Sequence, residues 1–161
     1  MSISKKQIAE YVIEEKENHY RLAYSYVRNV DDALDIVQES IYKAFSSIDS
    51  LKEPKYMKTW YYRIIVNNAI DFLRKRKRLI LVDDEVLASY NPAMDDSYQN
   101  FDLQKALNDL PEKYRSIIIL RYFEDLKIEE VAEILGRNVN TVKTQLYTAL
   151  EKLRININDL E

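Results

Sequence analysis

Residues 128–150 read IEEVAEILGRNVNTVKTQLYTAL, and this stretch decides the fold of the C-terminal part of the chain. Counted from Ile128, the fifth position is Ala132, whose small side chain lets two helices pack closely. The ninth is Gly136, the single glycine of the chain, which takes the left-handed conformation of a tight turn without strain. The fifteenth is Val142, a branched apolar residue suited to the core between the helices. Together these positions predict a helix-turn-helix.

The two helices of this motif are predicted over residues 128–135 and 140–155, with Asn140 as the N-cap of the second. Apolar side chains at helical spacing should form their shared core, which we expect to contain Ile128, Val131, Leu135, Leu146, Leu150 and Leu153.

The outer face of the second helix carries short hydrogen-bonding side chains and a lysine near its N-terminus. Such side chains suit a helix that reads the major groove of DNA. A plain helical hairpin with a glycine turn would use the same three positions without touching DNA, but the pattern favours DNA binding. The candidate contacts are Asn140, Thr141, Lys143, Thr144, Gln145 and Thr148.

The composition indicates an all-helical protein. The 161 residues include one glycine, three prolines and 32% charged residues, so helix breakers are scarce. The absence of cysteine excludes a disulfide or a thiolate metal site, and the lone His19 cannot form a histidine cluster. No apolar run is long enough to span a membrane, so we expect a cytoplasmic protein.

The order of helices and charges predicts two small helical domains joined by an acidic linker. We expect the first domain over residues 1–78, the linker over 79–101 and the second domain over 102–161. The net charge is +4 in residues 1–78 and −6 in residues 79–102. A basic block before an acidic one suggests a face that binds nucleic acid beside a segment that repels DNA or imitates its negative charge. The charge totals alone fit a chance fluctuation along the chain equally well.

Three helices are expected in the first domain: one from about Ser4 to Tyr26, a second from Asp31 or Asp32, and a third from about Tyr56 to Arg78. In the second helix an apolar stripe should face the core, and it comprises Leu34, Val37, Ile41, Ala44, Phe45 and Ile48.

The third helix ends in five consecutive cations, Arg74 to Arg78. Cations bind phosphates, and nearby aromatic residues such as Trp60 and Tyr62 can stack on unpaired bases. Two structural explanations are equally open at this point. Cations are favoured at a helix C-terminus, and aromatic residues at helical spacing, Trp60 above all, usually belong to a core.

Several motifs in one order give the chain a family resemblance. Residues 32–39, DALDIVQE, resemble region 2.2 of extracytoplasmic-function (ECF) sigma factors of the sigma-70 family. Residues 58–64, KTWYYRI, and 69–75, AIDFLRK, resemble regions 2.3 and 2.4. Residues 110–115, 120–126 and 141–144 resemble region 4. The resemblance extends over nearly the whole chain.

A sigma factor binds core RNA polymerase and directs promoter-specific initiation without catalysis of its own. The resemblance implies that the second helix binds the clamp helices of the polymerase, and that the second domain binds the flap. The residues implied in clamp binding are Asp35, Gln38, Glu39, Tyr42 and Lys43, of which the first three share the face opposite the expected apolar stripe.

The third helix and the loop before it, about Ser47 to Tyr56, would open the −10 element and capture a flipped base. The implied −10 contacts are Lys58, Arg63, Asn67, Arg74 and Arg78. The −35 element would be read by the helix-turn-helix residues Asn140, Thr141, Lys143, Thr144, Gln145 and Thr148. The acidic linker would thread toward the active centre of the polymerase.

Some positions depart from the family pattern. Family members often have arginine where Gln145 stands and a basic residue near Tyr147, so phosphate anchoring is weaker here and a glutamine–adenine contact becomes possible. Lys127 replaces the usual Ser or Thr cap, and Val66 stands where arginine is frequent.

The V-type, lysozyme-responsive subgroup of Gram-positive bacteria is the most similar, through residues 21–27, 32–40 and 138–147. That resemblance implies a cell-envelope stress response and a membrane-anchored anti-sigma factor, which would mask the polymerase-binding faces and could hold the protein near the membrane.

Two other classes of function are open. A conventional helix-turn-helix regulator would bind duplex DNA alone, usually as a dimer. An enzyme is disfavoured, because the chain has no glycine-rich phosphate loop and the carboxylates Asp83 and Asp84 lie in the linker without a pocket. We therefore expect no catalytic residue, metal, cofactor or small-molecule substrate.

Overall fold

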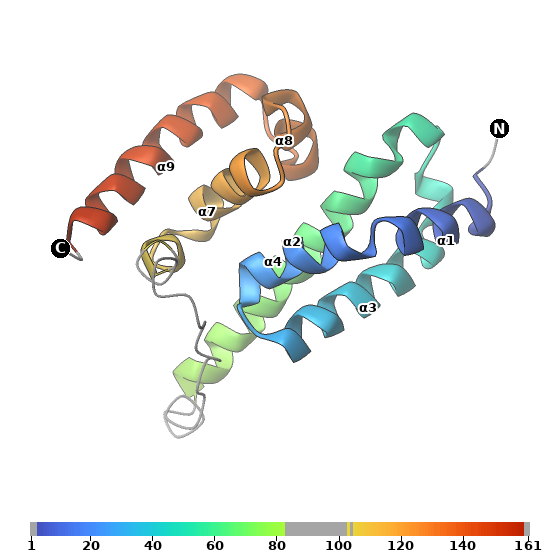
Figure 1. Ribbon diagram of the computed structural model, residues 1–161, viewed down its shortest axis with the longest axis horizontal. Helices are drawn as coiled ribbons and strands as arrows, with labels where there is room; N and C mark the ends of the chain where they lie inside the picture. The colour runs from blue at the N-terminus through green and yellow to red at the C-terminus, as the bar shows by residue number, and fades with distance from the viewer. Residues whose placement is uncertain (1–2, 83–102, 104, 160–161) are drawn as a thin grey trace. The chain divides into compact units, whose positions relative to one another are not determined.

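The computed structural model describes residues 3–82, 103 and 105–159, and no β-strand occurs among them. The chain divides into two compact units, one N-terminal and one C-terminal (Figure 1). The all-helical class predicted from the composition is confirmed. The predicted linker lies outside the described residues, except for the end of the third helix.

The N-terminal unit is built around one long helix, α4. The elements in chain order are α1 (Lys5–Glu14), α2 (Lys16–Val27), α3 (Val30–Ser46), the 3₁₀ turns η1 (Ile48–Ser50) and η2 (Pro54–Tyr56), and α4 (Met57–Val82). The helix α4 packs against both α2 and α3, which also pack against each other, while α1 contacts α3 (Figure 1).

The expected first helix is two helices. It begins as predicted at Ser4, whose hydroxyl caps the Gln7 N–H at 3.2 Å while the Gln7 side chain accepts from the Ser4 N–H. It breaks at Glu15, where φ is −102° and ψ is 13°. The sequence near Glu15 contains neither glycine nor proline, so no local signal marks this break.

The start and the buried face of α3 also differ from the prediction. The cap is Asn29, whose side chain accepts from the Asp32 N–H at 2.9 Å, and not Asp31 or Asp32. Leu34 was expected in the core but is 52% exposed. The buried residues are Ala33, Ile36, Ser40 and Ala44, of which Ala44 was predicted. The other three lie one residue, or about 100° around the helix, before predicted positions. The small residues among them favour close packing of α3.

Polar side chains join α3 to α4 inside the N-terminal unit. Ser40 Oγ donates to the Ile36 carbonyl at 2.7 Å, and Asn68 Nδ2 donates to Ser40 Oγ at 2.8 Å. Lys43 Nζ completes the chain by donating to Asn68 Oδ1 at 2.5 Å. Because Asn68 is buried, leaving its amide unpaired would cost about 1–3 kcal/mol. The network therefore favours one alignment of α3 on α4.

A hydrogen bond joins the first turns of α4 to the segment that precedes this helix. Trp60 is half-buried rather than mostly buried as predicted, and its indole N–H donates to Ser50 Oγ in η1 at 2.9 Å. At its other end α4 continues to Val82, four residues beyond the expected end at Arg78.

An aromatic cluster surrounds His19 in the N-terminal unit. The ring centroids of Tyr61, Tyr11 and Tyr62 lie 4.5, 5.5 and 5.8 Å from that of His19. His19 is 1% exposed, and within the described residues neither of its ring nitrogens has a hydrogen-bond partner. Burial lowers the pKa of His19 to about 4, although the nearby Glu15 carboxylate acts in the opposite direction. The fold therefore holds this imidazole neutral.

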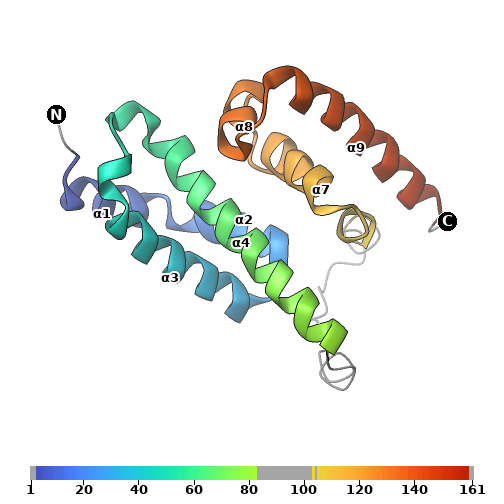
Figure 2. The ribbon, with the colours of Figure 1, turned by 180° about the vertical axis from the view of Figure 1, so that it is seen from behind.

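The C-terminal unit contains the predicted short helices. Residues 105–108 are helical, and Leu107 and Leu110 pack with Ile118 and Ala149 in a common core. The elements that follow are α7 (Glu112–Ile118), the π-helical segment η3 (Ile119–Phe123), α8 (Ile128–Leu135) and α9 (Val139–Asp159). Figure 2 shows α7 alongside α9, and both α7 and α8 contact α9.

The helix after Pro111 changes its hydrogen-bonding pattern along its length. Pro111 stands at the N-cap of α7. After Ile118 the helix widens to the π-helical segment η3.

The buried imidazole predicts a pH-dependent loss of stability. The unfolded chain binds a proton at His19 near pH 6.5, whereas the folded chain binds it near pH 4, so falling pH favours unfolding. The contribution of His19 is fully present above pH 6.5, and about 3 kcal/mol is lost by pH 4. Denaturant unfolding at both pH values should show this loss in the native chain and not in His19→Phe. Equal losses in the two proteins would contradict a neutral buried His19.

Candidate nucleic-acid interfaces

The turn between α8 and α9 has the predicted geometry. Gly136 adopts φ 65° and ψ 39°, in the left-handed region. The Arg137 N–H donates to the Ala132 carbonyl at 2.9 Å, and the Gly136 N–H donates to the Glu133 carbonyl at 3.3 Å. These two bonds form a Schellman motif, which ends α8 and turns the chain into α9.

The three diagnostic positions of the motif occupy the expected environments. Ala132 is 4% exposed and Val142 is fully buried, so both lie in the core of the unit. Leu150 was expected in the core but is 39% exposed. The helix-turn-helix predicted from these positions is confirmed.

The N-cap of α9 is Asn138, not Asn140 as predicted. Asn138 Oδ1 accepts from the Asn140 N–H at 2.7 Å, and the Asn138 carbonyl accepts from the Val142 N–H at 3.0 Å. Because the N-cap lies two residues earlier than expected, Asn140 lies in the first turn of α9 with an exposed side chain.

The outer face of α9 collects most of the predicted duplex contacts. Thr141, Thr144, Gln145 and Thr148 share this face because they are spaced three or four residues apart. Asn140, Thr141, Lys143 and Thr144 are exposed, while Gln145 and Thr148 are half-buried. This face offers several hydroxyl and amide groups beside a single lysine.

A polar contact that the sequence did not suggest fixes one of these side chains. Arg137 Nη1 donates to Gln145 Oε1 at 2.9 Å and to the Lys113 carbonyl of α7 at 3.2 Å. Arg137 follows the turn glycine, but its reach to α7 and α9 depends on how three helices pack. No local pattern could have indicated this contact.

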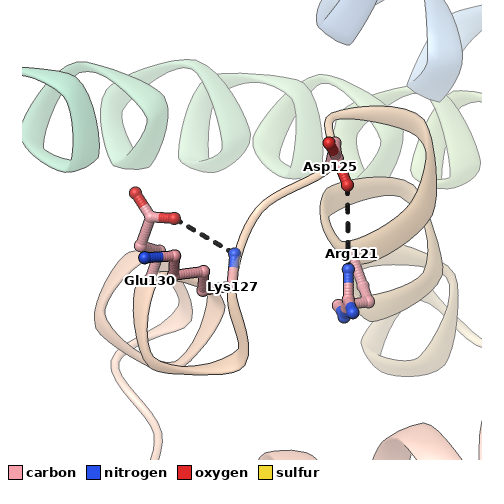
Figure 3. A network of polar contacts seen from close by, with 4 residues as sticks. All are labelled: Arg121, Asp125, Lys127 and Glu130. Atoms are coloured by element: carbon pink, nitrogen blue, oxygen red, sulfur yellow. Dashed lines mark hydrogen bonds and ion pairs between the residues drawn. The ribbon is translucent and has the colours of Figure 1, made fainter.

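The entry to α8 accommodates the lysine that replaces the usual hydroxyl cap. The Lys127 N–H donates to Glu130 Oε1 at 3.1 Å (Figure 3). A lysine ammonium cannot accept a hydrogen bond, so the bond from the cap side chain to the backbone is missing. The other capping-box bond, from the Lys127 N–H to the Glu130 carboxylate, is present. Before it, Arg121 pairs with Asp125 at 3.9 Å, and Asp125 adopts φ 54° (Figure 3). The departure at Lys127 therefore leaves α8 intact.

The predicted −10 contacts lie on exposed parts of α4. Arg63, Asn67, Arg74 and Arg78 are exposed and, with the exposed Asp71 among them, recur at helical spacing along one side. Lys58, in the first turns of α4, is also exposed.

The run of five cations does not form one surface. Arg76 is half-buried and interacts with Asp32 of α3. Burial lowers the pKa of Arg76 and raises that of Asp32, while the attraction between the two groups opposes both shifts. Arg76 therefore serves the packing of α3 on α4, whereas Arg74 and Arg78 point to solvent.

The outer face of α3 mixes charged and apolar groups. Asp35, Gln38 and Glu39 are exposed as predicted. Beside them Leu34 is 52% exposed and Tyr42 is 69% exposed. Large apolar side chains exposed side by side are a feature of surfaces that bind another protein.

Lys43, the remaining predicted residue of this face, is half-buried and bonded to Asn68. It lines an open pocket of about 410 Å³ between α3 and α4, whose wall includes Asp35, Glu39, Asp71 and Lys75.

None of the described helices is long and apolar enough to cross a lipid bilayer.

Comparisons with known proteins agree with these features. Sigma-70 region 2 matches residues 14–79, and Sigma-70, region 4 matches residues 100–153. The chain is 53% identical to the RNA polymerase sigma factor SigV of Bacillus subtilis over 146 residues, which is 91% of this chain and 88% of that protein. It is 36% identical to the ECF RNA polymerase sigma factor SigW of the same organism, over 90% of this chain and 86% of that one.

A solved structure is also similar. The sigma factor RpoE of Bartonella quintana, solved in complex with the anti-sigma factor NepR, matches with a TM-score of 0.76 and 28% identity, over 95% of this chain and 98% of that one. The chain therefore belongs to the ECF group of the sigma-70 family of RNA polymerase sigma factors.

Proposed function

We propose that this sigma factor binds core RNA polymerase through the outer face of α3 and reads a two-part promoter through α4 and α9. Its family consists of transcription initiation factors, not enzymes. The observation that carries the proposal is the presence, in one chain, of an exposed basic helix and a helix-turn-helix in segments that match regions 2 and 4.

The polymerase contact is assigned to the outer face of α3. Asp35, Gln38 and Glu39 offer hydrogen-bond acceptors, and Tyr42 adds a large apolar surface with a polar tip. Lys43 contributes at the inner edge of this face, where its bond to Asn68 holds it in place. The clamp helices of the polymerase are the proposed partner of α3, and the flap is the proposed partner of the C-terminal unit.

The −10 element is assigned to α4 and the loop before it. The cations Lys58, Arg63, Arg74 and Arg78 would neutralise phosphates of the opened strand, and Asn67 would lie beside a flipped base. Trp60 supports the loop through its bond to Ser50, so the base-capturing segment starts from a defined position.

The −35 element is assigned to α9. Asn140, Thr141, Lys143, Thr144, Gln145 and Thr148 are the proposed contacts. Because this set holds one cation, sequence reading by hydrogen bonds would contribute more here than phosphate neutralisation. The proposed division of the chain is a −10 and clamp domain over residues 1–78, an acidic linker over 79–101, whose first residues 79–82 continue α4, and a −35 domain over 102–161.

Regulation by an anti-sigma factor is also part of the proposal. RpoE was solved with the anti-sigma factor NepR, and the chain resembles SigV over most of its length. The exposed Leu34 and Tyr42 give α3 an apolar surface that an inhibitor could cover in place of the polymerase. We propose a cytoplasmic protein that a membrane-anchored anti-sigma factor holds inactive until cell-envelope stress releases it.

Transcription from purified components tests the proposed function. Bacillus subtilis core polymerase, the full chain and fragmented genomic DNA should give run-off transcripts that start at a small set of shared promoter sequences. Core polymerase alone is the control. Binding of the chain alone to duplex DNA, with no transcript from any fragment, would instead indicate a conventional regulator.

Substitution of the α3 face tests the polymerase contact. Asp35→Ala combined with Gln38→Ala should weaken binding to core polymerase by roughly tenfold, because both side chains would lie in the contact. Both are exposed, so the fold should survive. The matched control is Glu10→Ala with Glu14→Ala, two exposed sites on α1. Equal affinities for the two double variants would remove the assignment of α3.

Salt dependence tests the phosphate contacts of α4. Replacing Arg63 and Arg78 with Gln should lower the slope of log affinity against log salt by roughly one to two units, since about 0.7 unit is lost for each single-strand phosphate contact. The measurement is binding of the holoenzyme to promoter DNA at several salt concentrations. Replacing the exposed Lys6 and Lys16 with Gln should leave the slope unchanged. A slope that does not respond to Arg63 and Arg78 would contradict this role for α4.

A further inference from the structure

Arg137 is held in place at both its backbone and its side chain. Its N–H closes the Schellman motif on the Ala132 carbonyl, and its guanidinium donates to the Lys113 carbonyl of α7. The same nitrogen, Nη1, donates to Gln145 Oε1 at 2.9 Å. The side chain is half-buried between α7 and α9. Arg137 can therefore act as a fixed donor that determines how Gln145 is oriented.

The chemistry of arginine decides which end of the Gln145 amide faces it. A guanidinium has donors only, so the amide oxygen must point to Arg137. The amide nitrogen, which lies in the same plane as the oxygen but on the other branch of the amide, then keeps its two N–H donors away from the guanidinium. The reverse orientation is excluded, because it would place the amide N–H donors against the N–H donors of the guanidinium.

The orientation restricts which base Gln145 can read. A glutamine that binds adenine turns its oxygen and nitrogen together toward N6 and N7 of the base. Here the oxygen already accepts a hydrogen bond from Arg137, so one of its two lone pairs is occupied and the unengaged N–H donors are the groups best placed to contact a base. Guanine presents two acceptors, O6 and N7, along its major-groove edge, whereas adenine presents one acceptor beside a donor.

We propose that Arg137 is a positioning residue that orients Gln145, so that α9 donates hydrogen bonds to a guanine of the upstream promoter element. The proposal rests on the proposed reading of that element by α9. It replaces the glutamine–adenine contact that the sequence alone suggested. Gln145 shares the outer face of the helix with Thr141, Thr144 and Thr148, so its donors lie among the other proposed contacts.

Selection from a promoter library tests this proposal. Holoenzyme assembled from the full chain and Bacillus subtilis core polymerase would select promoters whose −35 element is randomised. The position whose base preference disappears in Gln145→Ala is the one that Gln145 reads. There the native chain should prefer guanine to adenine, and Arg137→Met should shift the ratio toward adenine by about tenfold, the scale of one good base contact.

A second variant keeps the test independent of any folding defect in Arg137→Met. Gln145→Glu retains an acceptor for Arg137 but has no N–H donor, so it should lose the guanine preference and favour cytosine, whose N4 amine donates. The control is Arg154→Met, because Arg154 pairs only locally with Glu151 at 3.2 Å among the interactions described and is exposed. It should leave the preference unchanged.

Three results would overturn the proposal. The first is a native preference for adenine at the Gln145 position. The second is an Arg137→Met variant that binds every sequence more weakly without a change in base preference, since this would assign Arg137 a purely structural role. Both leave the reading of the −35 element by α9 intact. The third, no base selection at any −35 position by the native chain, would overturn the proposed function as well.

Discussion

Burial of only one side of the long helices α4 and α9 is the constraint on which the surfaces of both units depend. Shorter helices cover the inner side of each, α2 and α3 on α4 and α7 and α8 on α9. The uncovered side of α4 carries Arg63, Arg74 and Arg78, and that of α9 carries Thr141 and Thr144. The packing that stabilises each unit thereby also decides which residues are available to bind DNA.

The same packing sets the surface of α3. Small buried residues, Ala33 and Ala44 among them, favour close packing, and the Ser40–Asn68 bond aligns α3 on α4. The rotation that buries them turns Leu34 and Tyr42 outward beside Asp35. The exposed apolar residues on this surface are thus a consequence of how the core is packed, and such exposed apolar groups suit a protein-binding face.

Features with a local chemical cause were predictable from the sequence. The turn at Gly136 was predicted correctly, because only glycine takes the left-handed conformation there without cost. The bounds of α8 also agree with the prediction residue by residue. Of the buried side of α3 only Ala44 was predicted, because Ala33 and Ser40 give a weaker apolar signal than the exposed Leu34. The partners of Arg76 and Arg137 depend on packing between helices distant in the sequence, which a periodic pattern does not encode.

The two helices proposed to bind DNA have different physical tasks. Several arginines on α4 suit phosphate binding to an opened strand, while hydroxyl and amide groups on α9 suit recognition of base edges. If both act on one promoter, strand opening should require the chain and core polymerase together.

Permanganate reactivity of thymines in a promoter bound by this sigma factor tests that claim most directly. The account predicts reactive, unpaired thymines around the −10 element only when the chain and core polymerase are both present. Protection of duplex DNA by the chain alone, without any unpaired thymines in the presence of core polymerase, would contradict it.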